Sequence, residues 1–247
     1  MKKVKIIDYI NKVAPFDKRV SGDNIGELIK GKDNIRRVMI CLDISKEAIA
    51  FASSSKVDLI VTHHPVIYNP LFRIDDDVIL AAIRNKIGII SAHTNYDAAR
   101  LNDVLAEKCE VSVIGNIFLE DGIYLGRIGN TAKISFYDYL DKIKTNLKVD
   151  TVKITGKIPH DVEKVAIGTG SSSSFIEEIK YLDVDVFITG EIKYDNLKSL
   201  AFEKPAVIEL GHYESEECFI DDLSNLLSKR FPKLDVITYK KRISIYI

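Results

Sequence analysis

The hydrophobic and polar positions along the chain predict short helices that alternate with buried strands. The segment 3–14 has apolar residues at helical spacing, and Pro15 ends this pattern. Short apolar runs between polar loops predict strands at 37–42, 57–62, 87–91, 165–168, 184–189 and 206–210. Helices are predicted at 46–55, 76–86, 100–109, 137–147 and 214–230, with a loop and helix over 171–181. This alternation indicates βαβ units and the α/β fold class.

Two segments depart from this alternation of strands and helices. The segment 112–136 has four glycines among short apolar runs, which predicts antiparallel ribbons, so we expect mixed sheets. Apolar and polar residues alternate at the end of the chain, where Ile243, Ile245 and Ile247 predict a terminal strand.

The sequence also contains an internal repeat. Residues 57–62 resemble residues 184–189, which lie 127 positions later, and Val38 matches Val165 at the same offset. A strand, a helix and a second strand therefore recur without a change of length.

The next strand repeats at an offset of 119. Residues 93–97 parallel residues 212–216, and each segment has a histidine followed four residues later by a carboxylate. The pattern predicts two related halves, at 38–97 and 165–216, whereas chance similarity between generic α/β segments is the alternative. Related halves would direct both sets of strand ends into one cleft, the usual ligand position in such sheets.

The predicted lobes are discontinuous in sequence. The first comprises residues 1–111 with about 205–247 and contains most of the candidate metal ligands. The second comprises about 112–204.

Charge and cysteine content restrict the class of protein. The formal charge is −1, from 35 basic and 36 acidic residues, so nothing attracts the whole chain to nucleic acid or anionic membranes. Cys41, Cys109 and Cys218 are widely spaced, which argues against a disulfide framework and a thiolate zinc site. The N-terminus lacks the apolar core of a signal peptide, and no run reaches about 18 apolar residues. We expect a cytoplasmic protein with no membrane partner.

Four of the five histidines come directly after predicted strands, and two carboxylates follow close behind. The candidate metal ligands are His63, His64, Asp97, His212 and Glu216. Three imidazoles and two carboxylates exceed the needs of one tetrahedral zinc, and they suit two divalent ions of the zinc, iron or manganese kind. Each residue also has an ordinary interpretation, such as a solvated loop histidine, a turn aspartate or a first-turn glutamate.

The loop 168–174 joins a strand to a helix and contains Ser171 to Ser174. Its N–H groups and hydroxyls can bind a phosphate at a helix N-terminus. No Gly-Lys-Ser/Thr follows, so a tight turn with a serine cap is the favoured interpretation.

Five blocks together resemble the signature of a known family. They are Asp23–Gly26, Val61–Pro65, Ser91–Ala99 with Asn102–Asp103, Phe187–Glu191 and Gly211–Glu216. The chain resembles the short form of the NGG-interacting-factor-three-like family, whose bacterial members are often named GTP cyclohydrolase type II-like homologues.

The resemblance implies two interlocked α/β domains, a dinuclear metal centre and a toroidal homohexamer. Matched block by block, it carries the metal ligands over to the five residues named above. It makes His93 a neighbour of the metals, as an outer partner or a proton shuttle. Glu191 occupies the position of His64 in the second half.

We therefore expect a dinuclear-metal protein, a metal-dependent hydrolase that acts on a nucleotide or another phosphorylated small molecule. GTP cyclohydrolase-type activity is implied by the resemblance alone. The alternative is a non-catalytic, metal-binding oligomeric scaffold for nucleic acid or a protein partner.

Overall fold

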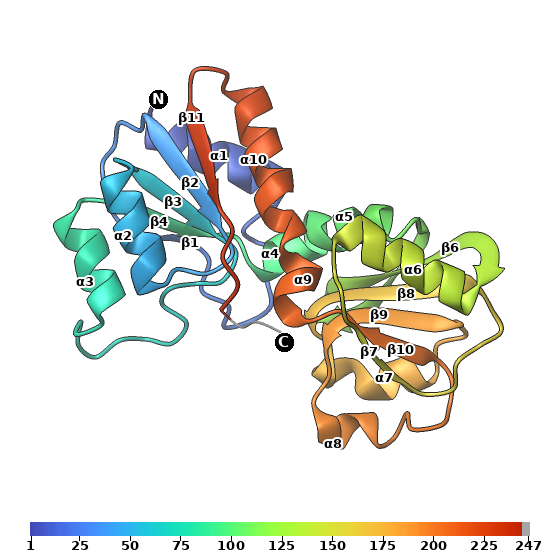
Figure 1. The fold of residues 1–247 in the computed structure, drawn as a ribbon. Helices are drawn as coiled ribbons and strands as arrows, with labels where there is room; N and C mark the ends of the chain where they lie inside the picture. Colours follow the sequence, from blue (N-terminus) through green and yellow to red (C-terminus); the bar gives the residue numbers. More distant parts are fainter. Residues whose placement is uncertain (244–247) are drawn as a thin grey trace. The chain divides into compact units, whose positions relative to one another are not determined.

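The computed structural model describes residues 1–243, which form two compact units. The first unit comprises Met1–Ala99 with Phe219–Arg242, and the second comprises Arg100–Cys218. Each unit has one mixed sheet with helices on both faces, which confirms the predicted α/β class (Figure 1). Among the described residues, no helix is both long enough and apolar enough to cross a membrane.

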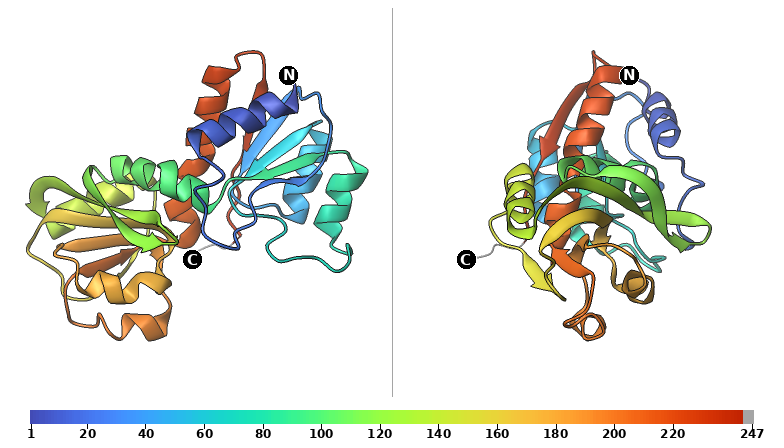
Figure 2. Two further views of the ribbon diagram at one scale, coloured as in Figure 1. Left: turned by 180° about the vertical axis from the view of Figure 1, so that it is seen from behind. Right: turned by 90° about the vertical axis from the view of Figure 1, so that its right-hand side faces the viewer.

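The sheet of the first unit has five strands in the order β1-β4-β3-β2-β11. They are β1 (Gly26–Ile29), β2 (Arg37–Cys41), β3 (Leu59–Thr62), β4 (Gly88–Ser91) and β11 (Asp235–Tyr239). Only β1 is antiparallel to its neighbour. One face carries α2 (Lys46–Ser54) and α3 (Asp77–Arg84), and the other carries α1 (Lys3–Val13) and α10 (Cys218–Arg230) (Figures 1 and 2).

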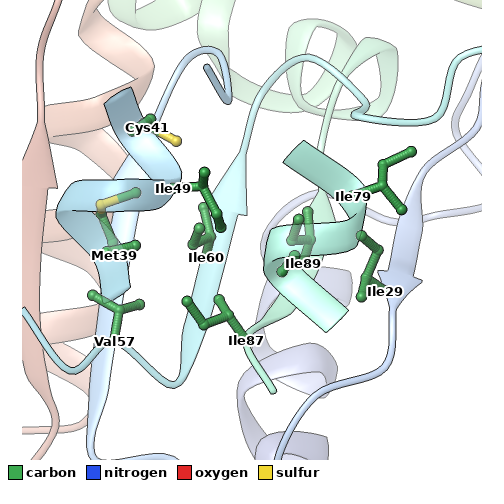
Figure 3. Close-up of a cluster of buried hydrophobic side chains, with 12 residues drawn as sticks. Ile29, Met39, Cys41, Ile49, Val57, Ile60, Ile79, Ile87 and Ile89 are labelled. Carbon is green, nitrogen blue, oxygen red and sulfur yellow. The ribbon is translucent and has the colours of Figure 1, made fainter. Parts of the chain in front are cut away.

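The core of this unit lies between the sheet and helices α2 and α3. Met39, Ile60 and Ile89 come from three neighbouring parallel strands, and they pack with Ile49 of α2 and Ile79 of α3 (Figure 3). All five side chains are buried, and each contributes roughly 1.5–3 kcal/mol through removal from water. This packing holds the strand ends at one edge of the sheet.

Side-chain caps set where these two helices begin. Ser45 Oγ accepts a hydrogen bond from the Ala48 N–H, and Asp76 Oδ1 accepts from the N–H groups of Val78 and Ile79. Each cap satisfies donors that the first helical turn leaves without an intrahelical acceptor.

A buried carboxylate fixes the entry to β3. Asp58 accepts hydrogen bonds from Lys32 Nζ at 2.6 Å and from the backbone N–H groups of Arg36 and Arg37 at 2.8 and 3.3 Å. Burial raises the pKa of this carboxyl, but these donors outweigh burial and hold the pKa below its usual value. Asp58 therefore stabilises the fold in its ionised form.

The sheet of the second unit has six strands in the order β5-β6-β8-β9-β10-β7. They are β5 (Ser112–Glu120), β6 (Ile123–Ser135), β7 (Lys153–Thr155), β8 (Asp161–Ser171), β9 (Val186–Glu191) and β10 (Ala206–Glu209). β8, β9 and β10 are parallel, and the remaining pairs are antiparallel.

The helices of the second unit are short. Helices α5 (Asn102–Lys108) and α6 (Phe136–Leu147) contact β6 and β8. Helix α7 (Ile176–Lys180) and helix α8 (Tyr194–Leu197) supply Ile179 and Leu197 to a core that includes Phe187 of β9. Helix α9 (His212–Glu216) follows β10 and contacts β8 and β9.

Strand pairing follows the same offset of 127 residues as the sequence similarity. Val38 pairs with Leu59 across β2 and β3, and Val165 pairs with Val186 across β8 and β9. Asp185 accepts hydrogen bonds from two backbone N–H groups at the start of β8, as Asp58 does at the start of β2.

The third strands align differently from the sequence match. Thr62 pairs with Ser91 in the first unit, and Thr189 pairs with Glu209 in the second, so the offset there is 118. Strand register therefore aligns His93 with the residue before His212, whereas the sequence match at 119 aligned the two histidines with each other.

Several elements differ from the sequence predictions. Strands β1, β7 and β11 were not predicted, and the long helix expected at 214–230 is divided into α9 and α10. β10 pairs with β9 and β7, so it belongs to the second sheet, whereas the expected first lobe resumed near 205. Of the predicted terminal strand, 244–247 lie outside the described residues, and Ile243 lies in a bend.

We predict that Asp58→Asn lowers the free energy of unfolding at neutral pH by about 1–3 kcal/mol, because buried donors lose a charged acceptor. The folded pKa of Asp58 is lowered, so its contribution is present above the unfolded pKa of about 3.9. That contribution is lost as the pH falls through the folded value. Urea unfolding at a series of pH values measures the difference between wild type and variant.

Asp183→Asn is the matched control. The Asp183 carboxylate is 95% exposed and contacts Lys164, so its removal should change stability little. A stability difference for Asp58→Asn that stays constant down to about pH 2 would contradict the assignment.

Candidate metal centre

Three histidines gather where two parallel strands of the first unit end. His63 and His64 follow β3 directly, and His93 lies two residues after β4, which pairs with β3. The ring centroid of His63 lies 5.2 Å from the ring centroid of His64 and 5.2 Å from that of His93. The ring centroids of His64 and His93 are 5.6 Å apart. The ligand-capable atoms of the three side chains all lie within 4.8 Å of one another. We call these residues the imidazole cluster.

In each ring of the imidazole cluster, Nδ1 contacts its own fixed acceptor. His63 Nδ1 lies 2.8 Å from the Ala92 carbonyl oxygen, which accepts its proton. His64 Nδ1 donates to Asp43 at 2.7 Å, and His93 Nδ1 donates to Asp23 at 2.9 Å. These contacts select the tautomer that keeps Nε2 as the ligand atom. This is the arrangement found around metal-binding histidines, so the cluster fits a divalent metal.

Asp23 is itself held in place. Its carboxylate also accepts hydrogen bonds from the backbone N–H of Thr94 at 3.1 Å and from Thr94 Oγ1 at 2.5 Å. Burial raises the pKa of Asp23, but His93 and Thr94 lower it further than burial raises it, to below the usual value. No role was predicted for Asp23 and Asn24 from the sequence. Asn24 Nδ2 donates to the Ile67 carbonyl and so anchors the loop that follows His64.

Asp97 adds a carboxylate to the imidazole cluster. Its Oδ1 lies 3.5 Å from His63 Nε2. Asp97 begins a π-helical turn (Asp97–Leu101), a rare conformation that is frequent at functional sites. Phe219 packs against the His63 ring at a centroid distance of 4.9 Å.

The second unit has its own imidazole and carboxylates. His212 and Glu216 lie four residues apart on α9, with His212 Nε2 and Glu216 Oε2 3.2 Å apart. His212 Nδ1 donates to Glu191 Oε1, at the end of β9, at 3.1 Å. The hydrogen bond to Glu216 is the main reason that the pKa of His212 rises to about 9. Glu191 adds to this effect, and burial opposes it. A metal ion can replace the proton that the His212–Glu216 pair holds.

Two glycines make room for this pair. Gly170 has φ +60°, and a Cβ there would overlap Glu216 Oε1. A Cβ at Gly190 would overlap the Gly170 carbonyl and Ser215 Oγ. Both positions require glycine because the backbone approaches polar groups of α9 closely.

The serine-rich loop has structural contacts. Ser172 Oγ is hydrogen-bonded to Thr189 Oγ1 at 2.9 Å, and Ser173 Oγ accepts from the Lys193 N–H at 2.9 Å. Asn102 of the matched block is also structural, because its side chain joins the Thr169 N–H to the Leu125 carbonyl.

Within the first unit, the structure brings His63, His64 and Asp97 together with His93. Within the second, it brings His212 and Glu216 together with Glu191. Sequence reasoning missed Asp43. Its position two residues after β2, which pairs with the strand that His63 and His64 follow, is the signal that identifies it.

A family model for Duf34/NIF3 (NGG1p interacting factor 3) matches residues 1–243. The chain belongs to this family. A Campylobacter jejuni protein named GTP cyclohydrolase 1 type 2 homolog is 31% identical over 236 residues, covering 92% of this chain and 93% of that protein.

Solved structures agree with this assignment. Reduced HcgD from Methanocaldococcus jannaschii is 30% identical, with a TM-score of 0.83 over 96% of this chain and 97% of that chain. A Staphylococcus aureus hypothetical protein has a TM-score of 0.86 at 22% identity, over 100% of this chain and 99% of that chain. The second likeness shows the shared fold.

We predict that Gly170→Ala destabilises the second unit and weakens metal binding by His212 and Glu216. A positive φ costs an alanine about 1–2 kcal/mol, and displacement of Glu216 adds about 1–3 kcal/mol. Gly122→Ala is the matched control, because Gly122 also has a positive φ but nothing lies within 4 Å of its Cβ position. Urea unfolding and metal titration compare the two variants. Equal losses in both would mean that the approach of Glu216 to Gly170 does not matter.

Proposed function

We propose that this protein is a metal-dependent hydrolase that acts on a nucleotide-like substrate. His63, His64 and Asp97 of the first unit and His212 and Glu216 of the second would supply the metal ligands. The observation that carries the proposal is the imidazole cluster, in which every Nδ1 is committed to a fixed acceptor. Three rings held in this way are preorganised for divalent metal.

The donor set supports two divalent ions per subunit, of the zinc, iron or manganese kind. The five proposed ligands exceed the four of a tetrahedral zinc site. They comprise the imidazoles of His63, His64 and His212 and the carboxylates of Asp97 and Glu216, and mixed nitrogen and oxygen donors suit these metals. Bound metal of this kind supplies Lewis-acid activation of water and of the scissile group.

The protein's own residues hold this chemistry in place. Asp43 and the Ala92 carbonyl orient two imidazoles, and Glu191 orients the ring of His212. Asp97 and Glu216 bring negative charge that offsets the charge of a cation. Glu216 is almost fully buried, so its charge acts with little screening by water.

The substrate class rests on the relatives. Those described above include a protein named GTP cyclohydrolase 1 type 2 homolog, which supports a purine nucleotide such as GTP as the first substrate to test. The alternative is a non-catalytic metal-binding scaffold for nucleic acid or a protein partner. The test must distinguish this scaffold from a hydrolase.

The decisive experiment combines metal content with hydrolysis. We expect untagged wild-type protein to contain stoichiometric zinc, iron or manganese by elemental analysis, and to hydrolyse GTP or another nucleotide. Asp97→Asn should lower metal affinity at least about 10–100-fold and should lower hydrolysis with it. His160→Gln, which alters a 94% exposed side chain, is the control that should change neither.

Two results would count against the proposal. If Asp97→Asn loses its metal and still hydrolyses nucleotide at the wild-type rate, the metal is not catalytic. If wild-type protein holds metal but hydrolyses no member of a nucleotide panel, the scaffold interpretation replaces the hydrolase.

We also propose that the chain assembles as a homohexamer, as the family resemblance implies. Light scattering on the purified protein should give a mass about six times the 27.8 kDa of one chain. A monomer mass at micromolar concentration would contradict this assembly.

A further inference from the structure

The second unit contains a cavity of 340 Å³ at one edge of its sheet. The side chains around it include Lys153 at the start of β7, Glu191 at the end of β9 and Glu209 at the end of β10. These three strands are neighbours in the sheet, in the order β9-β10-β7 (Figure 1). Open α/β sheets bind their ligands at the carboxyl ends of parallel strands, which is the position of this cavity. Of the proposed metal ligands, only His212 borders it.

An ion pair between two strands forms part of the cavity wall. Lys153 and Glu209 are paired in register across β7 and β10, and Lys153 Nζ lies 2.9 Å from Glu209 Oε2. The Glu209 side chain is 7% exposed, and its Oε1 accepts a hydrogen bond from the Ile192 N–H at 2.9 Å. Glu209 is therefore fixed by the backbone, and it holds the ammonium group of Lys153 at the cavity.

Lys153 has hydrogen-bond donors left for a ligand. An ammonium group has three N–H donors, and the contact with Glu209 uses one of them. The Lys153 side chain is 56% exposed, so the remaining donors are accessible. Thr151, two residues earlier, lines the same cavity and adds a hydroxyl group.

Glu191 supplies acceptors to the same cavity. Its Oε1 accepts from His212 Nδ1 at 3.1 Å, and the Glu191 side chain is 56% exposed. An ionised carboxylate accepts hydrogen bonds at both oxygens and donates none. A ligand in the cavity therefore meets donors from Lys153 and acceptors from Glu191.

The charges around the cavity disfavour a phosphate group. Lys153 is accompanied by two carboxylates, Glu191 and Glu209, and the His212 ring is engaged by Glu191 and Glu216. A dianionic phosphate would meet repulsion from these carboxylates.

The size of the cavity restricts the ligand further. A volume of 340 Å³ is near the lower end of small-molecule sites, which suits one part of a nucleotide better than a whole nucleoside triphosphate. The edges of a purine base carry acceptors together with N–H donors, such as O6 and the 2-amino group of guanine. Such an edge matches both Lys153 and Glu191.

We propose that this cavity binds the base of a nucleotide, with Lys153 donating to an acceptor of the base and Glu191 accepting from one of its N–H groups. Glu209 is the positioning residue for Lys153. This inference rests on the proposed nucleotide substrate, and it assigns recognition of the base to the second unit.

Equilibrium binding to untagged protein tests the proposal without turnover. The probes are guanosine and adenosine, which have no phosphate, and ribose 5-phosphate and inorganic pyrophosphate, which have no base. We expect wild-type protein to bind at least one nucleoside. Lys153→Met should weaken that binding about 10–100-fold, because a charged hydrogen bond is lost. It should leave binding of the two phosphate probes unchanged.

Two further variants separate recognition from folding. Lys153→Met combined with Glu209→Gln avoids a buried unpaired carboxylate and keeps an acceptor for the Ile192 N–H. We expect this double variant to bind nucleoside as weakly as Lys153→Met. Lys164→Met is the matched control, because Lys164 is 53% exposed and paired with Asp183 but does not line this cavity. Urea unfolding checks that each variant is folded.

Three results overturn the proposal. Wild-type protein that binds neither nucleoside at millimolar concentration has no base site. A double variant with wild-type affinity for nucleoside makes Lys153 and Glu209 a structural pair only. A greater loss for pyrophosphate than for nucleoside would assign the cavity to phosphate.

Failure of the proposed function gives a different result. A protein that binds nucleoside through Lys153 but hydrolyses no nucleotide keeps the base site and is not a hydrolase. A protein that hydrolyses nucleotide, and whose double variant keeps the wild-type KM, is a hydrolase that recognises the base elsewhere.

Discussion

The parallel pairing of β3 with β4 is the constraint on which the first unit's site depends. Thr62 pairs with Ser91 at the last position of both strands, so the residues that follow leave the sheet at the same edge. Ser91 Oγ then donates to the His63 carbonyl at 2.8 Å, which fixes the backbone at the point where the imidazoles begin. Apolar packing of α2 and α3 against these strands sets the register, and the register sets the distances between the rings.

Orientation is a second requirement that pairing alone does not meet. Adjacent residues such as His63 and His64 direct their side chains differently, so each ring needs its own acceptor to aim Nε2. The chain supplies a backbone carbonyl for His63 and carboxylates from other segments for His64 and His93. These acceptors come from positions as far away in sequence as Asp23, and for this reason a motif around the histidines does not contain the whole site.

The sequence predicted most of the regular elements because strand cores and helix faces leave strong periodic signals, as in the segments 57–62 and 184–189. It missed β1, β7 and β11 because these edge strands are only three to five residues long and depend on one neighbouring strand for pairing. It pointed to the histidines because four of the five follow predicted strands. It gave no role to Asp23 and overlooked Asp43, because an acidic residue in a loop resembles any turn residue until its partner is known.

Positions related by the offset of 127 carry different side chains at the ends of β3 and β9. Thr62 is followed by His63 and His64, and Thr189, its equivalent, is followed by Gly190 and Glu191. A side chain at Gly190 would overlap the Gly170 carbonyl, so the second unit has no space for an imidazole there. Its imidazole comes instead from His212 at the start of α9, and Glu191 binds the Nδ1 of that ring. The position of His64 in the first unit thus corresponds to Glu191 in the second, and Glu191 orients the His212 ring as Asp43 orients the His64 ring.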